Sequence, residues 1–251
     1  MKNGTRKSQK KSPIKNNTME TLNTTRHIDI LNPDMISDLR IDVIGCGATG
    51  SKIALSLAKL GITNIHCWDF DTVESHNIPN QVYTLQDVGK LKVEALQRII
   101  KEATGTTTIT AHNEKVDGTQ ELGDIVFLLT DTMSSRKEIW EAGLKYKMRT
   151  SLLIETRMGK DAGMIYTLNP NSIGHIKEWE NTLYEDQEAE VSSCGSTISV
   201  GPTADIVSGY AVWQFMRWFQ IEKKEADDTL ENEIIFSLRS TYTMSRQFNT
   251  Y

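Results

Sequence analysis

The chain has 251 residues, enough for one α/β domain to bury a full core without disulfides or metal. Hydrophobic residues make up 38% and charged residues 24%, as in ordinary globular proteins, and the formal net charge of −5 argues against a nucleic-acid partner. No apolar run is long enough to span a bilayer, and the N-terminus lacks a signal-peptide core, so we expect no membrane partner. The 3 cysteines form no CxxC pair, which is typical of the reducing cytoplasm.

The first segment, residues 1–23, is rich in Lys, Asn, Ser and Thr. Such a composition cannot form a core, so we expect a disordered basic tail that keeps the protein in solution or binds RNA, DNA or an acidic partner weakly. Residues 24–251 are expected to form a single nucleotide-binding domain.

The next feature is a strand that runs into a glycine turn. Residues 40–44 form a short β-branched run, typical of a buried parallel strand. The sequence GCGATGS comes next, and residues 52–60 then have helical periodicity, ending at Gly61. Residues 64–68 read as the second strand, with Asp69 and Asp71 at its carboxyl end.

This order has the physical logic of a nucleotide site. The loop residues that we expect to contact the nucleotide are Gly45, Gly47, Ala48 and Gly50. The glycines permit a tight turn, a close approach to phosphate and close packing of the helix, whose start attracts anions. An acid about 20 residues later can accept hydrogen bonds from ribose hydroxyls. A purely structural turn is the alternative. A phosphate-loop kinase motif is excluded, because Ser51 and Lys52 stand where Lys and then Ser or Thr are needed.

Three further motifs come after the second strand: DFDTVESHNIPNQ, GKLKVEAL and DIVFLLTD. In this order they resemble the ubiquitin-activating-like adenylyltransferases of the ThiF/MoeB type over about residues 24–220. The matching residues are Gly45, Gly47, Gly50, Asp69, Asp71, Asn77, Gln81, Gly89, Lys92 and Asp131. One position departs from the family pattern: Asn80 stands where the family has an arginine that contacts the ATP phosphates.

The resemblance implies roles for several polar residues. Asn77, Asn80 and Gln81 would contact the nucleotide, although turn formation around a proline is an alternative. Lys92 would bind phosphate, and Asp131 would bind Mg²⁺ or its waters, with an N-cap role for the helix at residues 134–146 as the alternative. Arg26 would reach the ATP of a second subunit in a homodimer, or would be an ordinary surface arginine.

Three cysteines have different contexts. Cys46, in the glycine turn, and Cys67, in a strand, are expected to be inert packing residues. Cys194 lies in the polar sequence SSCGS, roughly where related activating enzymes place a reactive cysteine on a crossover loop. It would take an acyl group from an adenylate, or it is an unreactive loop cysteine.

Later segments complete the predicted fold. We expect strands at residues 106–116, 124–130, 150–155, 164–168 and 234–238, an aromatic helix at 203–221, and a polar loop at 171–191. Arg157 is expected in a turn, where it would recognise a carboxylate or be solvated. The predicted class is α/β, with a Rossmann-like, mostly parallel sheet flanked by helices and a later antiparallel extension.

The resemblance implies a Mg²⁺- and ATP-dependent, homodimeric adenylyltransferase. Its catalytic residues would be Cys194, Arg26, Lys92 and Asp131, and its substrate the C-terminal carboxylate of a small ubiquitin-like or sulfur-carrier protein, with thioester or persulfide transfer at Cys194 as a further step. The alternatives are a catalytically inactive nucleotide-binding scaffold, a family member that modifies a tRNA or a peptide, and an NAD-dependent oxidoreductase.

Overall fold

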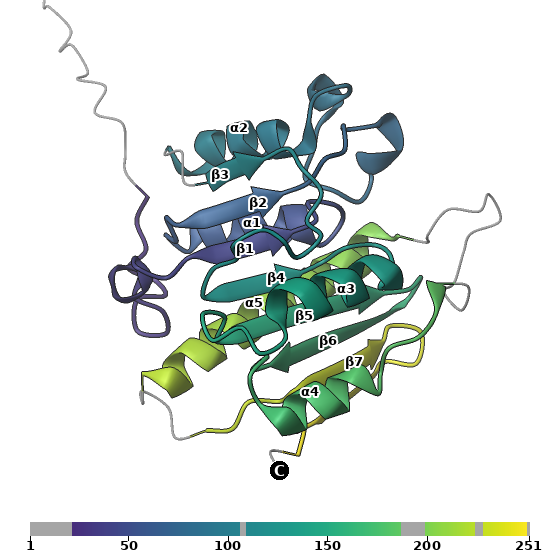
Figure 1. Cartoon of the computed structure of the whole chain (residues 1–251). Coiled ribbons are helices and arrows are strands. Elements are labelled where there is room, and N and C mark those ends of the chain that lie inside the picture. Colours follow the sequence, from purple (N-terminus) through teal and green to yellow (C-terminus); the bar gives the residue numbers. More distant parts are fainter. Residues whose placement is uncertain (1–21, 106–108, 187–198, 224–227, 250–251) are drawn as a thin grey trace, which may run out of the picture.

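A mixed β-sheet forms the centre of the molecule (Figure 1). The computed structural model describes residues 22–105, 109–186, 199–223 and 228–249. Within these residues the sheet has 8 strands, in the spatial order β3-β2-β1-β4-β5-β6-β7-β8. The strands are β1 (Ile41–Ile44), β2 (Ile65–Trp68), β3 (Ile109–His112), β4 (Ile125–Leu128), β5 (Leu152–Met158), β6 (Ala162–Leu168), β7 (Glu233–Ser237) and β8 (Tyr242–Arg246).

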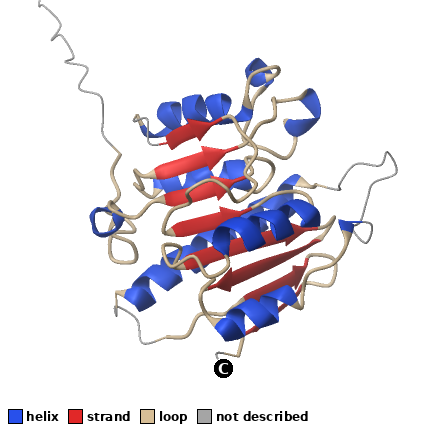
Figure 2. Cartoon of the chain, viewed as in Figure 1, coloured by secondary structure: helices blue, strands red, loops and turns tan. Residues whose placement is uncertain are grey.

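Strand direction divides the sheet into two parts. β1 pairs in parallel with both β2 and β4, and the outer pairs β2–β3 and β4–β5 are also parallel. From β5 onwards each strand pairs antiparallel with the next, through β6 and β7 to β8. The predicted Rossmann-like sheet with an antiparallel extension is therefore confirmed (Figure 2).

Helices cover both faces of the sheet. The α-helices are α1 (Gly50–Lys59), α2 (Lys92–Thr104), α3 (Met133–Ile139), α4 (Ile173–Glu180) and α5 (Gly201–Glu222). Short helical turns are η1 (Pro33–Ile36), η2 (Ser75–Asn77), η3 (Leu85–Asp87) and the π-turn η4 (Trp140–Leu144). Helices α1, α2 and α5 lie on one face, and α3 and α4 lie on the other (Figure 1).

The alternation of side chains in β4 explains why the central strands are apolar at every position. Ile125 and Phe127 point into the core under α1 and α5, whereas Val126 and Leu128 point into the core under α3 and α4. All four are fully buried. A parallel strand covered on both faces has no solvent side, so its sequence shows a continuous apolar run.

The expectation of a polar loop at residues 171–191 is wrong for its described part, because residues 173–180 form α4. The Ser172 hydroxyl accepts from the amide of His175 and caps the helix, and Ile176 and Trp179 are buried. The spacing of these two apolar residues is the helical signal that the charged composition obscured.

Two further differences concern the antiparallel part. Arg157 lies inside β5 and not in a turn, since β5 extends three residues beyond the predicted strand end at Glu155. The last strand, β8, was not predicted at all. It is the outer strand, pairs with β7 and is exposed along its whole length. Its sequence therefore has no buried apolar face from which a strand is predicted.

No helix among the described residues is both long and apolar enough to cross a membrane.

Candidate active site

The candidate site lies at the carboxyl edge of the parallel strands, where β1 and β4 are neighbours. The chain leaves β1 towards α1 on one face and leaves β4 towards α3 on the other, so the connections diverge at this point. Such divergence creates the crevice in which open α/β sheets bind ligands. The two loops touch, because a Cβ atom on Gly45 would lie 2.8 Å from the carbonyl oxygen of Leu129.

Three glycines shape the turn in different ways. Gly45 has a φ of +92°, a conformation that favours glycine. A Cβ on Gly50 would lie 1.8 Å from the carbonyl oxygen of Gly45, so any side chain there would force the turn apart. A Cβ on Gly47 would meet nothing within 4 Å. No atom of the described residues therefore requires a glycine at position 47. The open space beside Gly47 is where a phosphate would fit.

A buried acid, Asp69, ties the glycine turn to the second strand. One carboxylate oxygen accepts from the amide of Cys46 at 2.7 Å, and the other accepts from the amide of Asp71 at 2.9 Å. Burial raises the pKa of Asp69, and the Lys92 ammonium opposes this rise. Both oxygens thus organise backbone, and a ribose contact at Asp69 stays a prediction.

Lys92 starts α2 and returns to the same acids. Its Nζ lies 2.7 Å from a carboxylate oxygen of Asp71 and 4.0 Å from one of Asp69, and its side chain is 9% exposed. Its amide also donates to the carbonyl of Asp71 at 2.9 Å. The side chain of Asp71 is 51% exposed, so Asp71 is the more accessible acid of the pair. The lysine is thereby held at the edge of the site as a positive charge.

The loop between β2 and α2 is fastened to the glycine turn at two points. The amide of Val82 donates to the Ser51 hydroxyl at 3.3 Å, and the Tyr83 hydroxyl donates to the carbonyl of Cys46 at 2.8 Å. Asn77 shapes the loop from within, because its side-chain oxygen accepts from the amide of Glu74 at 2.8 Å. The structure gives Asn77 a turn-forming role, and its nucleotide contact stays a prediction.

Two amide side chains of this loop have free acceptor atoms. The Asn80 amide nitrogen donates to the carbonyl of Ser199 at 3.3 Å. The side-chain oxygens of Asn80 and Gln81 are buried and have no hydrogen-bond partner in the part of the chain that the structure describes. A buried acceptor without a donor is costly. A donor from a ligand would satisfy these oxygens.

Asp131 lies shortly after Leu128, the last residue of β4. It is exposed, and its carboxylate makes no hydrogen bond or ion pair with the described residues. The proposed N-cap alternative is wrong, because Thr132 is the N-cap of α3 and accepts from the amide of Ser135 at 3.3 Å. Asp131 is therefore available to a cation or a ligand at this edge.

Comparisons with known proteins agree with this geometry. The ThiF family model matches residues 23–249. The chain belongs to the ThiF family. The resemblance inferred from the motif order is thus confirmed.

The relatives differ in how far they match. The sulfur carrier protein ThiS adenylyltransferase of Escherichia coli K12 is 26% identical over 181 residues, which cover 68% of each chain. The Nedd8-activating enzyme E1 catalytic subunit of Drosophila melanogaster is 32% identical over 80 residues, covering 32% of this chain and 18% of its own. A crystal structure of Escherichia coli MccB with ATP has a TM-score of 0.66 at 18% identity and covers 88% of this chain and 67% of that chain. This last likeness shows the fold alone.

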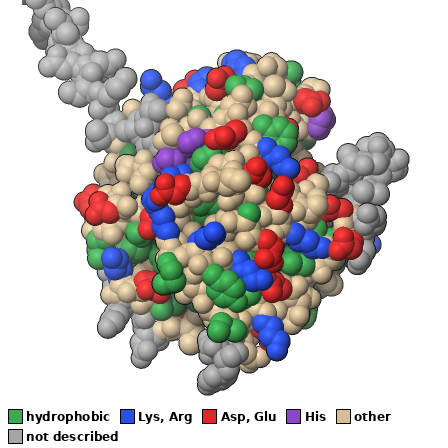
Figure 3. Space-filling view, viewed as in Figure 1, with side chains coloured by type: hydrophobic (Ala, Val, Ile, Leu, Met, Phe, Trp, Pro, Cys, Tyr) green, Lys and Arg blue, Asp and Glu red, His purple; other side chains and the backbone are tan. Residues whose placement is uncertain are grey.

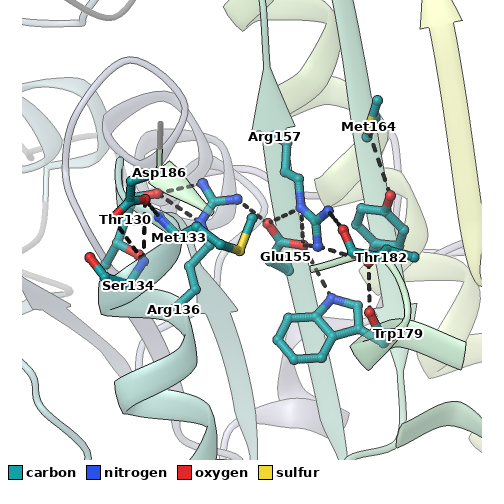
Figure 4. Close-up of polar contacts among 11 residues, drawn as sticks. Thr130, Met133, Ser134, Arg136, Glu155, Arg157, Met164, Trp179, Thr182 and Asp186 are labelled. Carbon is teal, nitrogen blue, oxygen red and sulfur yellow. Dashed lines mark hydrogen bonds and ion pairs between the residues drawn. The ribbon is translucent and has the colours of Figure 1, made fainter. Parts of the chain in front are cut away.

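Sequence reasoning missed a cluster of buried charges behind Asp131 in the ThiF-family chain. Glu155, on β5, is fully buried and pairs with both Arg136, from α3, and Arg157 (Figure 4). The Nε of Arg136 donates to the carbonyl of Thr130 at 3.0 Å, which fixes the backbone one residue before Asp131. The signal was an acid inside an apolar strand, since a buried charge requires partners.

The second arginine of the cluster anchors the chain that leaves α4. Arg157 donates to the carbonyl of Thr182 at 2.7 Å and to its hydroxyl at 3.0 Å, and its guanidinium lies 4.4 Å from the centre of the Tyr166 ring. The indole of Trp179 donates to Glu155 at 3.2 Å (Figure 4). Arg157 is thus held within the fold, and neither predicted role of this residue, carboxylate recognition or solvation, is needed to explain it.

Arg26 does not join the site of its own chain. It is exposed, and the neighbouring His27 contacts the carbonyl of Leu60 at 3.2 Å, at the end of α1 that is remote from the glycine turn. A contact between Arg26 and the nucleotide of a second subunit stays a prediction.

The three cysteines have separate outcomes. Cys194 lies outside the described residues, so its role stays a prediction. Cys46 and Cys67 are both fully buried. The neighbouring Cys67 and burial raise the pKa of the Cys46 thiol, which keeps it protonated and unreactive. Both observations agree with the expected packing role.

Gly50, which is crowded, and Gly47, which has open space beside it, provide a matched test of the turn. We expect Gly50→Ala to destabilise the fold by about 1–3 kcal/mol, because its methyl overlaps the Gly45 carbonyl. We expect Gly47→Ala to change stability by less than about 0.5 kcal/mol and to weaken nucleotide binding. Urea unfolding and calorimetric titration with ATP would measure the two effects. Equal loss of stability in both variants would contradict this assignment.

Proposed function

We propose that this protein is an ATP-dependent adenylyltransferase that activates the C-terminal carboxylate of a small ubiquitin-like or sulfur-carrier protein. The observation that carries the proposal is that the open Gly47, Lys92 and the free carboxylate of Asp131 belong to segments at the same carboxyl edge of the parallel strands, in a chain of the ThiF family. The name of one relative supports the same chemistry, since it is a ThiS adenylyltransferase.

The reaction follows from the charges. The substrate carboxylate attacks the α-phosphorus of ATP, a P–O bond forms, and the bond to the β-phosphate oxygen breaks to release pyrophosphate. The nucleophile is already an anion, so no general base is required. The task of the protein is to position the two anions and to neutralise their repulsion. Lys92 and the amides of the glycine turn would do this from one side of the crevice.

Mg²⁺ fits the donor set of this edge. No group of three or more His, Cys, Asp or Glu side chains within the described ranges would hold a metal by itself. Mg²⁺ typically binds one or two carboxylates and completes its shell with waters and substrate phosphates, so Asp131 alone is sufficient. When bound, the ion would screen the phosphates and polarise the reacting phosphoryl group.

We also propose that the protein acts as a homodimer. The position of Arg26, remote from its own glycine turn, supports a role across a subunit interface. Helix α5 offers an apolar surface for such an interface, since Ile206, Tyr210 and Trp213 line a shallow depression and Trp213 is 46% exposed. Large exposed apolar side chains in a cluster are typical of interfaces.

The alternatives receive less support. On the face shown in Figure 3, basic and acidic side chains are interspersed, which does not favour a tRNA substrate on that face. Membership of the ThiF family favours ATP over NAD. The only support for an inactive scaffold is Asn80, which replaces the arginine of the family pattern. A peptide substrate would present the same C-terminal carboxylate as a carrier tail, so the proposed chemistry applies to both.

The first experiment tests nucleotide and activity together. We expect calorimetric titration to show binding of ATP with Mg²⁺ and no binding of NAD. With a carrier protein added, the enzyme should exchange labelled pyrophosphate into ATP, because adenylation is reversible. Tight NAD binding without ATP binding would refute the proposal, and ATP binding without exchange would favour the scaffold.

Asp131→Asn is the sharpest variant for this assay. The residue is exposed and unpaired within the described structure, so we expect a change in unfolding free energy below about 0.5 kcal/mol. The loss of a metal ligand should lower exchange by about 100-fold or more, as several kcal/mol of charge stabilisation would be lost. Lys92→Ala is less informative, because it also leaves Asp69 and Asp71 without their cation.

Mixing two inactive variants tests the dimer. A hybrid of Arg26→Ala and Asp131→Asn subunits carries one site with its own Asp131 and the partner's Arg26. Random subunit exchange makes half of the dimers hybrids, each with one intact site of two, so we expect about one quarter of the wild-type rate. No recovery, despite exchange demonstrated by labelled subunits, would remove Arg26 from the site.

Cys194 determines the step after adenylation, and we propose that its thiolate takes the acyl group and releases AMP. Cys194→Ala should leave pyrophosphate exchange unchanged and eliminate the thiol-sensitive covalent adduct with the carrier, detected by mass spectrometry. If the wild-type protein forms no such adduct, the product is the free acyl adenylate.

A further inference from the structure

Acidic side chains outnumber basic ones around the candidate site, and a triphosphate is itself strongly negative. Asp69, Asp71 and Asp131 come after the two strands that flank β1, and Lys92 is the cation that pairs with the first two. Two arginines lie behind Asp131, but Glu155 and backbone carbonyls occupy them. Binding of ATP at this acidic edge would be favoured by a further cation from the same chain, in addition to Lys92 and a metal ion.

A second lysine lies beside the glycine turn. Lys52 is the third residue of α1, which begins at Gly50, and a helical side chain leans back towards the N-terminus of its helix. Its Nζ forms an ion pair at 2.6 Å with a carboxylate oxygen of Asp205, on α5. The Asp205 side chain is 64% exposed, whereas that of Lys52 is 19% exposed. An ion pair with a solvated carboxylate contributes little and is easily exchanged for a stronger anion.

The contacts of α5 place this ion pair next to the nucleotide loops. Asp205 lies one helical turn after Gly201, and a Cβ on Gly201 would lie 3.0 Å from the carbonyl oxygen of Pro79. Further along α5, the Ser208 hydroxyl donates to the carbonyl of Thr49 at 3.2 Å. Helix α5 therefore spans from the loop of Asn80 to the glycine turn, and Lys52 projects into the same region.

The order of the strands indicates which part of the nucleotide Lys52 would meet. The acids after β2 are where a ribose is bound in folds of this kind. Helix α5 packs on β5 and β6, which β1 and β4 separate from β2 in the sheet. A nucleotide with its ribose near Asp71 and its phosphates over Gly47 would therefore extend its terminal phosphates towards α5. The residue of the facing loop, Asn80, is neutral and supplies no charge there.

We propose that Lys52 leaves Asp205 and binds the phosphates beyond the α-phosphate when ATP is bound. The inference rests on the proposed function and adds a specific residue to it. Lys52 would neutralise the charge that accumulates on pyrophosphate as the bond to the α-phosphorus breaks. Asp205 holds the lysine in place until the nucleotide arrives, and its exposure to solvent makes the exchange easy.

Comparison of ATP with AMP tests this role by calorimetric titration. We expect Lys52→Ala to weaken ATP binding on the order of 10-fold or more, the loss of a charge-assisted contact, and to leave AMP binding unchanged. Lys52→Arg should restore part of the ATP affinity. Asp205→Asn should strengthen ATP binding, because it releases Lys52 from its competitor.

Two lysines serve as matched controls. Lys59 is exposed at the opposite end of the same helix, and Lys160 is exposed on the turn whose carbonyl accepts from the hydroxyl of Thr203. Alanine at either position should leave the ratio of ATP to AMP affinity unchanged. A loss of ATP affinity confined to Lys160→Ala would assign the phosphate contact to Lys160 and overturn the proposal.

The remaining outcomes are distinct. If Lys52→Ala and Asp205→Asn lower the melting temperature equally and leave both nucleotide affinities unchanged, the ion pair only joins α1 to α5, and the inference fails while the proposed function stands. If wild-type protein binds neither ATP nor AMP, the proposed function fails, and the role of Lys52 fails with it.

Discussion

The site depends on one buried carboxylate, that of Asp69. Its two oxygens accept from the amides of Cys46 and Asp71, and so join the turn after β1 to the chain after β2. A charge at this depth is costly, which is why burial raises the pKa of Asp69. Two backbone donors and the nearby Lys92 offset that cost, and the same two hydrogen bonds hold the glycine turn against the chain after β2.

A second buried carboxylate, that of Glu155, fixes the chain at the end of β4. Glu155 is buried on β5 and holds two arginines, one of which fixes the carbonyl of Thr130 before Asp131 (Figure 4). A buried ion cluster of this kind adds little net stability, but loss of one member leaves an uncompensated charge. Its value here is positional, since it fixes the end of β4 while Asp131 itself stays free.

The parallel half of the fold was predictable from sequence because local signals and tertiary structure agree there. Strand, glycine turn and helix succeed one another without interruption in residues 41–59, and Gly61 ends the helix with a φ of +91°. The later half was less predictable. The charged residues of α4 obscured the helical spacing of its buried Ile176 and Trp179. Strand β8 has no buried side chains, so no run of apolar residues marks it. The motif order assigned Asp69 and Asp71 to the nucleotide and Asp131 to the metal ion, but a sequence does not show which acid is buried or which already has a partner. Within the fold they separate: Asp69 binds backbone, Asp71 binds a lysine, and Asp131 binds nothing in the described residues. The cluster around Glu155 was missed because its partners come from α3, β5 and the end of α4, which only the folded chain brings together.

This separation of roles decides how the crevice handles charge. Amides and Lys92 already engage Asp69 and Asp71, so Asp131 is the acid of the three that is free for the proposed metal ion. The same reasoning applies to the cations. Lys92 is buried and lies near two acids, Asp71 and Asp69, whereas Lys52 is less buried and its ion-pair partner is the exposed Asp205. A reaction that transfers charge from substrate to pyrophosphate needs both kinds, one to hold the nucleotide and one to accompany the leaving group.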